Sequence, residues 1–272
     1  MCLILWALSG HPRYRLILAA NRDEFYQRPT SAAAYGSEGR GVLGGLDLQA
    51  GGTWLALGRN GRLAALTNYR DPETARPDAL SRGHLVKDFV RGTAPPAAYL
   101  ETVHNRRAAY NDFNLIVADG EQMWYLGSRE QRPRPVAPGI HGLSNHLLDT
   151  PWPKVTEGKA ALAAATAGDE VAPDALLALL TCRRQPEDHQ LPDTGVGLAW
   201  ERILSPRFIV TPSYGTRSSS VLLVSRQGRA TFCEWTFAPG VDPPAVTGRR
   251  CFKMALEKSG RVTNLDHGGK SS

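Results

Sequence analysis

The order of strand-like and helix-like segments limits the fold of this chain more than any other feature. Short apolar runs typical of strands occupy residues 2–8 and 14–20, and a second pair occupies 53–58 and 62–67. The second pair is joined through Asn60-Gly61, and Asn-Gly between apolar runs is a strong hairpin signal. Both pairs are therefore expected to form hairpins.

Helix-like segments separate the runs of strands. The Ala- and Leu-rich or periodic segments that predict helices are 80–91, 96–108, 153–166 and 173–182. Further strands are expected at 113–118, 122–127, 140–145, 219–225 and 229–237, and the Gly-rich stretch 36–52 is expected to be a long loop. Strict strand–helix alternation is absent, which disfavours a doubly wound parallel sheet. The pattern favours an α+β fold of two packed antiparallel sheets with helices outside.

The composition is that of an ordinary globular protein. Of the 272 residues, 42% are hydrophobic and 21% are charged, which excludes a disordered chain, a fibrous repeat and a coiled coil. No apolar run reaches about 18 residues, so no transmembrane helix is expected, and the N-terminus lacks the features of a secretory signal. We expect one domain over 1–258, a flexible tail over 259–272, and a cytoplasmic location, with mitochondrial association left open for a eukaryotic source.

Charge and cysteine content limit the partners. The chain has 32 Lys and Arg against 26 Asp and Glu, a net charge of +6. The scattered basic residues indicate a solvated surface, with an anionic partner as the alternative. No motif predicts nucleic-acid or metal binding, and the oligomeric state is left open. The 4 cysteines have no CxxC spacing; Cys182, Cys233 and Cys251 are interpreted as structural, and a reducing compartment is expected.

Cys2 differs from the other cysteines because it follows the initiator Met. Removal of Met1 would leave a free α-amino group, with an ordinary pKa of about 7.7–8.0, on the residue that carries the thiol. One residue then supplies both a nucleophile and a general base. The alternative is that Cys2 fills the core at the start of a strand.

A polar cluster, Asn21-Arg22-Asp23-Glu24, follows the strand at 14–20 and is expected to end it. Side chains alternate along a strand, so Asn21 and Asp23 should face one way and Arg22 and Glu24 the other. In a hairpin, Cys2 would lie opposite residue 20 or 21, beside this cluster. An Asp there could orient the amine or thiol, and an Arg could lower the pKa of the thiol. The alternative is a surface ion-pair network.

Several motifs together resemble one protein family. They are Met1-Cys2, Asn21-Arg22-Asp23-Glu24-Phe25, Gly52-Thr53-Trp54-Leu55, Leu66-Thr67-Asn68-Tyr69-Arg70 and Tyr214-Gly215-Thr216-Arg217-Ser218-Ser219-Ser220. By these motifs the chain is identified as a member of the NRDE family, also called the transport and Golgi organisation protein 2 family, over residues 2 to about 237. That family in turn resembles N-terminal nucleophile hydrolases of the choloylglycine hydrolase and penicillin V acylase group. The resemblance implies a four-layer αββα fold.

The resemblance also implies catalytic roles. Cys2 would be the nucleophile, Asp23 would contact its amine, and Asn68 would form part of the oxyanion hole. Asn145 would be a second site asparagine, and Arg217 would support the nucleophile region. These roles imply cleavage of an amide or acyl bond through a thioester on Cys2. We further expect Asn21, Arg22, Glu24, Trp54 and Tyr69 to contact the substrate.

One position departs from the hydrolase pattern. Those enzymes carry an arginine three residues before the aspartate, where this chain has Ala20. We expect Arg22 to replace it only from the opposite face of the strand. The departure weakens the prediction of hydrolase activity more than the prediction of the fold.

A carrier is the competing hypothesis, because the family is linked to haem trafficking and to lipid and acyl-CoA homeostasis. No cofactor is required, and any haem would be bound non-covalently and transiently, since no Cys-x-x-Cys-His motif is present. His141, His146 and Cys2 are the candidate ligands. The basic charge would suit haem propionates or a CoA phosphate. A structural or partner-binding protein with an inactive Cys2 is the third hypothesis.

Overall fold

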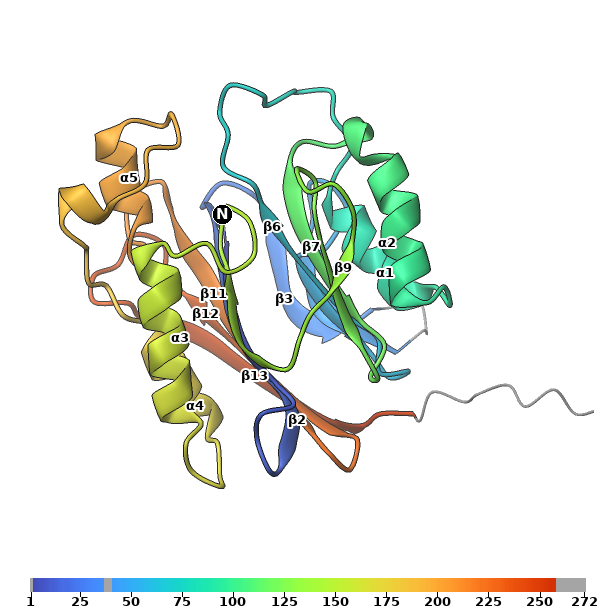
Figure 1. Cartoon of the computed structure of the whole chain (residues 1–272). Coiled ribbons are helices and arrows are strands. Elements are labelled where there is room, and N and C mark those ends of the chain that lie inside the picture. Colours follow the sequence, from blue (N-terminus) through green and yellow to red (C-terminus); the bar gives the residue numbers. More distant parts are fainter. Residues whose placement is uncertain (1, 37–40, 258–272) are drawn as a thin grey trace, which may run out of the picture.

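Two antiparallel sheets form the centre of the molecule (Figure 1). The computed structural model describes residues 2–36 and 41–257, so the expected tail at 259–272 lies outside the described residues. The first sheet has six strands, in the order β10 (Gly139–Leu143), β1 (Cys2–Leu8), β2 (Tyr14–Phe25), β11 (Tyr214–Ser225), β12 (Arg229–Phe237) and β13 (Val246–Ala255). The second has seven, in the order β3 (Thr30–Tyr35), β4 (Val42–Asp47), β5 (Leu55–Gly58), β6 (Leu63–Asn68), β7 (Phe113–Ala118), β8 (Met123–Gly127) and β9 (Arg134–Pro135).

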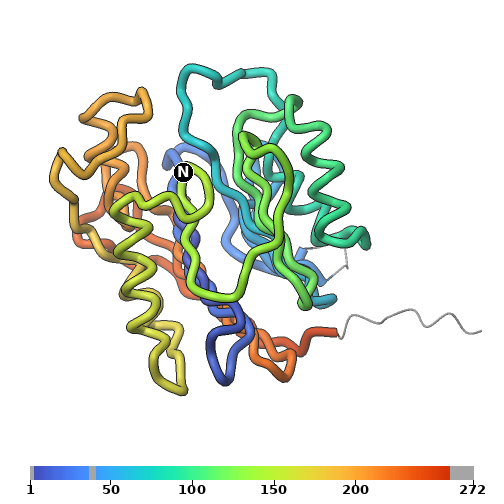
Figure 2. Tube along the Cα trace, in the orientation of Figure 1, coloured from blue at the N-terminus to red at the C-terminus, as the bar shows by residue number. Residues whose placement is uncertain are grey.

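Helices cover the outer face of each sheet, as the tube trace also shows (Figure 2). α1 (Gly83–Arg91) and α2 (Pro96–Asn105) lie on the second sheet, and α3 (Pro153–Ala165) and α4 (Pro173–Leu180) lie on the first. A short helix, α5 (Leu198–Leu204), follows α4 along the chain, and single 3-10 turns occur at Arg107–Ala109 and Asp188–Gln190. The expected layering of helix, sheet, sheet and helix is confirmed.

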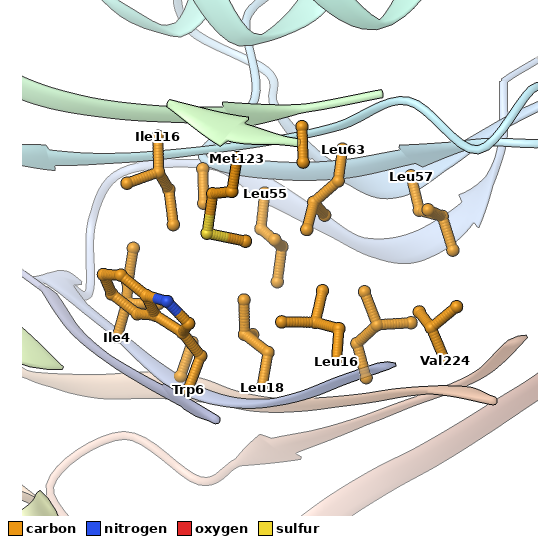
Figure 3. Close-up of a cluster of buried hydrophobic side chains, with 14 of the residues drawn as sticks. Ile4, Trp6, Leu16, Leu18, Leu55, Leu57, Leu63, Ile116, Met123 and Val224 are labelled. Atoms are coloured by element: carbon orange, nitrogen blue, oxygen red, sulfur yellow. The ribbon is translucent and has the colours of Figure 1, made fainter. Parts of the chain in front are cut away.

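Each pair of neighbouring layers has its own apolar core. Between the sheets, Ile4, Trp6 and Leu18 point toward Leu55, Ile116 and Met123 from the facing sheet (Figure 3). A second cluster fills the space between the first sheet and α3 and α4, and a third lies under α1 and α2. Strands buried on both faces read as nearly continuous apolar runs, which is why residues 2–8 and 113–118 were recognisable in the sequence.

Residues 36–52 do not form one long loop as expected. β4 occupies Val42–Asp47 and pairs with both β3 and β5. Glycine is unusual inside a strand, but here the six-membered ring of Trp54 lies where a Cβ on Gly45 would be, 2.3 Å from Cη2. The absence of a side chain lets the tryptophan pack on the strand. The glycines that suggested a loop are a packing requirement.

Replacing Gly45 with alanine should therefore destabilise the protein by about 1–3 kcal/mol, because the added methyl group overlaps the Trp54 ring. Urea unfolding would measure the loss. Gly168→Ala is the matched control, since a Cβ there meets nothing within 4 Å. Equal midpoints for the two variants would show that Trp54 can move without cost.

Other boundaries also differ from expectation. β2 continues to Phe25 instead of ending at Ala20, because β1 and β11 flank it and pair with its polar end. β11 begins at Tyr214, five residues before the expected start at Ser219. No sequence pattern predicted β3, β13 or α5, and the second helix ends at Asn105. β13 is mostly exposed, so its sequence lacks the apolar pattern of a core strand.

Two of the cysteines interpreted as structural form a disulfide, which was not expected. Cys233 of β12 and Cys251 of β13 are directly opposite in the strand register, with Cα atoms 4.1 Å apart. The partner of Cys233 could not be recognised because β13 itself was not. Cys182 is a free thiol.

No helix in the described ranges has the length and hydropathy needed to cross a bilayer.

Candidate functional site

A polar cavity of about 340 Å³ lies where the ends of β2, β4 and β6 meet the chain between β6 and α1. In Figure 1 that chain is the cyan segment that arches over one end of the two sheets. Most of the lining side chains are polar or charged. The lining residues are Arg22, Asp23, Glu24, Arg28, Asp47, Ala50, Thr53, Trp54, Leu66, Asn68, Arg76, Pro77, Ala79, Leu80, Ser81, Arg82, Gly83 and Asn111.

The register of the first hairpin brings Cys2 to this end of the sheet. The backbone of Cys2 pairs with that of Arg22, and Asp23 is the next residue along β2. The expected partner was residue 20 or 21. The difference arises because the chain reversal is longer than expected: the Ser9 N–H donates to the Arg15 carbonyl over 2.8 Å. The proximity of Cys2 to the Asn-Arg-Asp-Glu cluster is nevertheless as predicted.

The expected alternation along β2 is confirmed by its contacts. Arg22 stacks on Trp54, the residue directly before β5 of the facing sheet, with its guanidinium carbon 4.2 Å from the ring centre. Asn21 points the other way, and its amide donates to the carbonyls of Leu180 and Arg207 at 2.9 and 2.7 Å. Asn21 is 1% exposed and does not line the cavity. Its contacts connect β2 to the helical layer.

The predicted position of Arg22 relative to Ala20 was wrong. Ala20 belongs to the core between the sheets, and Arg22 contacts Trp54 from the same side. Residues two apart on a strand share a face. Arg22 therefore lies on the same face of β2 as Ala20, two residues closer to the end of the strand.

Glu24 and Arg28 form a charged network in the lining of the cavity. The guanidinium of Arg28 donates to the Asp47 carboxylate, with a shortest distance of 2.6 Å. The Glu24 carboxylate lies 3.7 Å from Arg22 and 3.9 Å from Arg28. The hydrogen bond from Arg28 and its charge hold the pKa of Asp47 below its usual range, against the effect of partial burial. Arg28 is therefore already neutralised.

Asp23 is a buried carboxylate at the edge of the cavity. It is 2% exposed and accepts a hydrogen bond of 2.7 Å from the Thr216 hydroxyl. Burial raises the pKa of Asp23, while the nearby Lys154 ammonium and the Thr216 hydroxyl act in the opposite direction. The sequence reasoning missed Lys154, which is 4% exposed and donates to the Leu204 carbonyl at 2.9 Å. Nothing in the amphipathic pattern of α3 marked it.

Asn68 and Asn145 have different environments. Asn68 lines the cavity, and within the described residues its side-chain amide makes no hydrogen bond. Asn145 is fully buried, and its amide donates to the backbone carbonyl of Asn68 at 2.9 Å. The carbonyl of Asn145 in turn accepts from the Arg70 N–H at 2.7 Å. Asn68 is thus available to a ligand, and Asn145 holds the backbone that carries it.

Arg217 lies at an irregularity in β11 and does not line the cavity. Thr216 pairs with Asp23 and Ser218 pairs with Arg22, so Arg217 is an extra residue between two register positions. Its guanidinium donates to the carbonyls of Phe25, Tyr26 and Arg28 at 3.0–3.2 Å. It therefore fixes the turn that follows β2, and this turn carries Arg28 into the lining of the cavity.

Tyr69 and the two candidate haem-binding histidines also lie outside the cavity lining. The Tyr69 ring contacts His146, with centroids 4.9 Å apart, and the Arg129 guanidinium at 4.8 Å. His146 Nδ1 lies 2.9 Å from the Thr150 hydroxyl. His141 bridges Asp149 and the Ala137 carbonyl at 2.7 and 2.9 Å. Each of these rings therefore has protein partners of its own.

These contacts predict opposite titration behaviour for the two histidines. The hydrogen bond to Asp149 raises the pKa of His141 above 6.5, while burial lowers the pKa of His146. Proton NMR titration of the ring resonances should show this order, and Asp149→Asn should lower the pKa of His141. Because the folded state binds the His141 proton more tightly, its stabilising contribution is complete below about pH 6.5 and is lost as pH rises through the folded pKa. A pKa of His141 below that of His146 would contradict the hydrogen bond between His141 and Asp149.

A buried ion pair that the sequence did not reveal supports the same region. The Arg70 guanidinium, two residues after Asn68, pairs with Glu201 of α5, and both side chains are 3% exposed. Glu201 also accepts hydrogen bonds from the backbone and hydroxyl of Thr194 at 3.0 and 2.5 Å. The residues are far apart in sequence and α5 was not expected, so no local signal could have found the pair.

These features define a four-layer αββα protein with a polar cavity at one end of its sheets. The chain belongs to the Transport and Golgi organisation 2 family, whose model matches residues 1–239, and the expected family is confirmed. The Transport and Golgi organization protein 2 homolog of Bos taurus is 42% identical over 264 residues, covering 89% of this chain and 95% of the relative. The Homo sapiens homolog is 38% identical over 255 residues, covering 86% and 92%.

Two solved structures show a partial likeness to the chain. A Caenorhabditis elegans N-acylethanolamine-hydrolyzing acid amidase ortholog aligns with a TM-score of 0.46 at 12% identity, covering 82% of this chain and 92% of its own. A mutant conjugated bile acid hydrolase from Clostridium perfringens aligns with a TM-score of 0.48 at 9% identity, covering 96% and 94%.

Proposed function

We propose that this protein is an N-terminal nucleophile hydrolase that cleaves an amide or acyl bond with Cys2. The observation that carries the proposal is the register of β1 and β2, which pairs Cys2 with Arg22 at the cavity, next to Asp23. Once Met1 is removed, the Cys2 amine accepts the thiol proton and the thiolate attacks the substrate carbonyl. The resulting ammonium then donates its proton to the leaving group, and water hydrolyses the thioester to release the acid and the free thiol.

The surrounding residues have matching roles in this proposal. The Asn68 amide, which has no other partner among the described residues, donates to the oxyanion of the tetrahedral intermediate. The Asp23 carboxylate orients the Cys2 amine, and Lys154 and Thr216 favour its ionised form despite its burial. Arg217 and Asn145 act indirectly, because they hold the backbone at Arg28 and at Asn68.

Intact mass spectrometry tests the proposal in two stages. The first measurement is the mass of the purified protein, which should lack Met1. The second follows incubation with a panel of N-acyl amides and acyl thioesters and an acid quench, and should show one added acyl group that peptide mapping places on Cys2. Cys182→Ser is the matched control, because it removes a free thiol of the described structure and should leave the adduct unchanged. Retention of Met1, in a host able to remove it, would contradict the mechanism.

A carrier that binds without cutting is the second candidate, favoured by the arginines of the cavity. Arg22, Arg28, Arg76 and Arg82 line it and would suit the phosphates of acyl-CoA or the propionates of haem. The described lining contains no His, Met or Tyr to serve as an axial haem ligand. Acyl-CoA therefore fits the described residues better. Saturable acyl-CoA binding without turnover would support the carrier, and haemin titration at the Soret band would report on haem.

A further inference from the structure

Arg22 is a buried cation with unused hydrogen-bonding capacity. Its residue is 6% exposed, and its Nη1 has no hydrogen-bond partner. In the described structure its guanidinium contacts are the Trp54 ring at 4.2 Å and the Glu24 carboxylate at 3.7 Å, beyond hydrogen-bond range. A guanidinium has five N–H donors, and leaving a buried charge without hydrogen bonds is costly. Arg22 lines the cavity, so a ligand bound there can supply acceptors to its guanidinium.

The other arginines of the cavity are already engaged. Arg28 binds the Asp47 carboxylate. Arg76 donates to the Ala108 and Tyr110 carbonyls at 2.7 and 3.1 Å, and Arg82 donates to the Asp112 carbonyl at 2.9 Å. Arg22 therefore has the least satisfied guanidinium of the four.

The packing around Arg22 fixes its guanidinium. Trp54 supports the guanidinium from the facing sheet and is itself packed on Gly45, whose missing side chain makes the contact fit. Stacking of this kind leaves the edge of a guanidinium, with its N–H groups, free to bind an acceptor. The planar fork matches the spacing of two oxygens on a carboxylate or phosphate. The unbound amide of Asn68 lines the same cavity and adds a neutral donor.

We propose that Arg22 is the anchor for an anionic oxygen group of the ligand, a carboxylate or a phosphate, bound in this cavity. The inference rests on the proposed function only in placing that group beside the bond that Cys2 attacks. It adds a substrate class: amides or acyl compounds that carry a negative charge close to the reacting carbonyl. Neutral compounds of the same shape should be poor ligands.

Isothermal titration calorimetry with inorganic phosphate, butyrate and neutral butanol tests the proposal. The wild-type protein should bind at least one of the two anions saturably and should not bind butanol. Arg22→Met should weaken anion binding by at least about tenfold. Arg249→Met is the matched control, because Arg249 also stacks on a tryptophan, at 5.2 Å from Trp235, but lies outside the cavity. Binding of phosphate alone or butyrate alone would identify the group.

Thermal unfolding provides a second measurement. In buffer without these anions, Arg22→Met should melt no lower than the wild type, because it removes an under-satisfied buried charge. Addition of the bound anion should raise the melting temperature of the wild type and of Arg249→Met, but not of Arg22→Met. Equal anion affinity in Arg22→Met and wild type, or no saturable anion binding by the wild type, would overturn the proposal.

The two proposals can fail separately. Anion binding needs neither the thiol nor turnover, so Cys2→Ala should bind phosphate or butyrate as the wild type does. An acyl-enzyme on Cys2 without anion binding would overturn only the role of Arg22. Arg22-dependent anion binding without an acyl-enzyme would overturn only the hydrolase.

Discussion

Replacing Cys2 with alanine should abolish acyl-enzyme formation and lower amide turnover by at least about 10³-fold, the scale seen when a covalent nucleophile is removed. The alanine variant keeps the α-amino group and the strand but has no group that can form a thioester. Ligand binding should survive, because the described lining of the cavity is unchanged. Turnover of the best substrate from the mass-spectrometric screen would measure the loss, and calorimetry on the same variant would measure retained binding.

The controls for this prediction separate chemistry from folding. Cys182→Ala removes a free thiol of the described structure and should leave turnover unchanged. Circular dichroism of Cys2→Ala should match that of the wild type. Turnover that persists in Cys2→Ala would exclude the proposed nucleophile and leave the carrier as the better account.

Replacing Glu201 with alanine should lower the free energy of unfolding by about 3–5 kcal/mol, the usual result of removing one partner of a buried ion pair. The change leaves Arg70 charged and almost fully buried, with its guanidinium 4.8 Å from the Trp152 ring. It also removes the acceptor of both Thr194 hydrogen bonds. Urea unfolding followed by far-ultraviolet circular dichroism would measure the effect.

Two further variants make this result specific. The double variant Arg70→Met, Glu201→Leu should recover much of the lost stability, because it removes the charge of Arg70 together with that of Glu201. Asp188→Asn breaks an exposed ion pair between Asp188 and Arg202, which is the neighbour of Glu201 in α5. This variant should leave the unfolding midpoint unchanged. A Glu201→Ala midpoint equal to that of Asp188→Asn would show that water reaches Arg70 freely.

Much of the fold was predictable because its central strands are buried on both faces. The hairpin through Asn60-Gly61 was predictable because Asn-Gly is typical of a tight turn that needs a positive φ, and Gly61 has a φ of +77°. β4 was missed because Gly44 and Gly45 serve tertiary packing, which no local pattern reveals. β13 was missed because it is largely exposed.

The candidate site was predictable where it depends on strand alternation. The opposite orientation of Asn21 and Arg22 follows from period two, and the structure shows both. The contacts of Arg217 and Asn145 were not predictable, because both bind backbone carbonyls of segments distant in the sequence. The environment of Asp23 was hidden for the same reason: Lys154 and Thr216 reach it from α3 and β11.

The extra residue in β11 makes this strand sensitive to changes in length as well as to substitution. Arg217 shifts the pairing so that Thr216, and not its neighbour, lies beside Asp23. Deleting one residue between Tyr214 and Ser218 would rotate the preceding side chains to the other side of the sheet while the apolar half of the strand stayed in place. A homologous chain could therefore keep the other motifs and the whole core yet lose the environment of its aspartate through a single codon deletion.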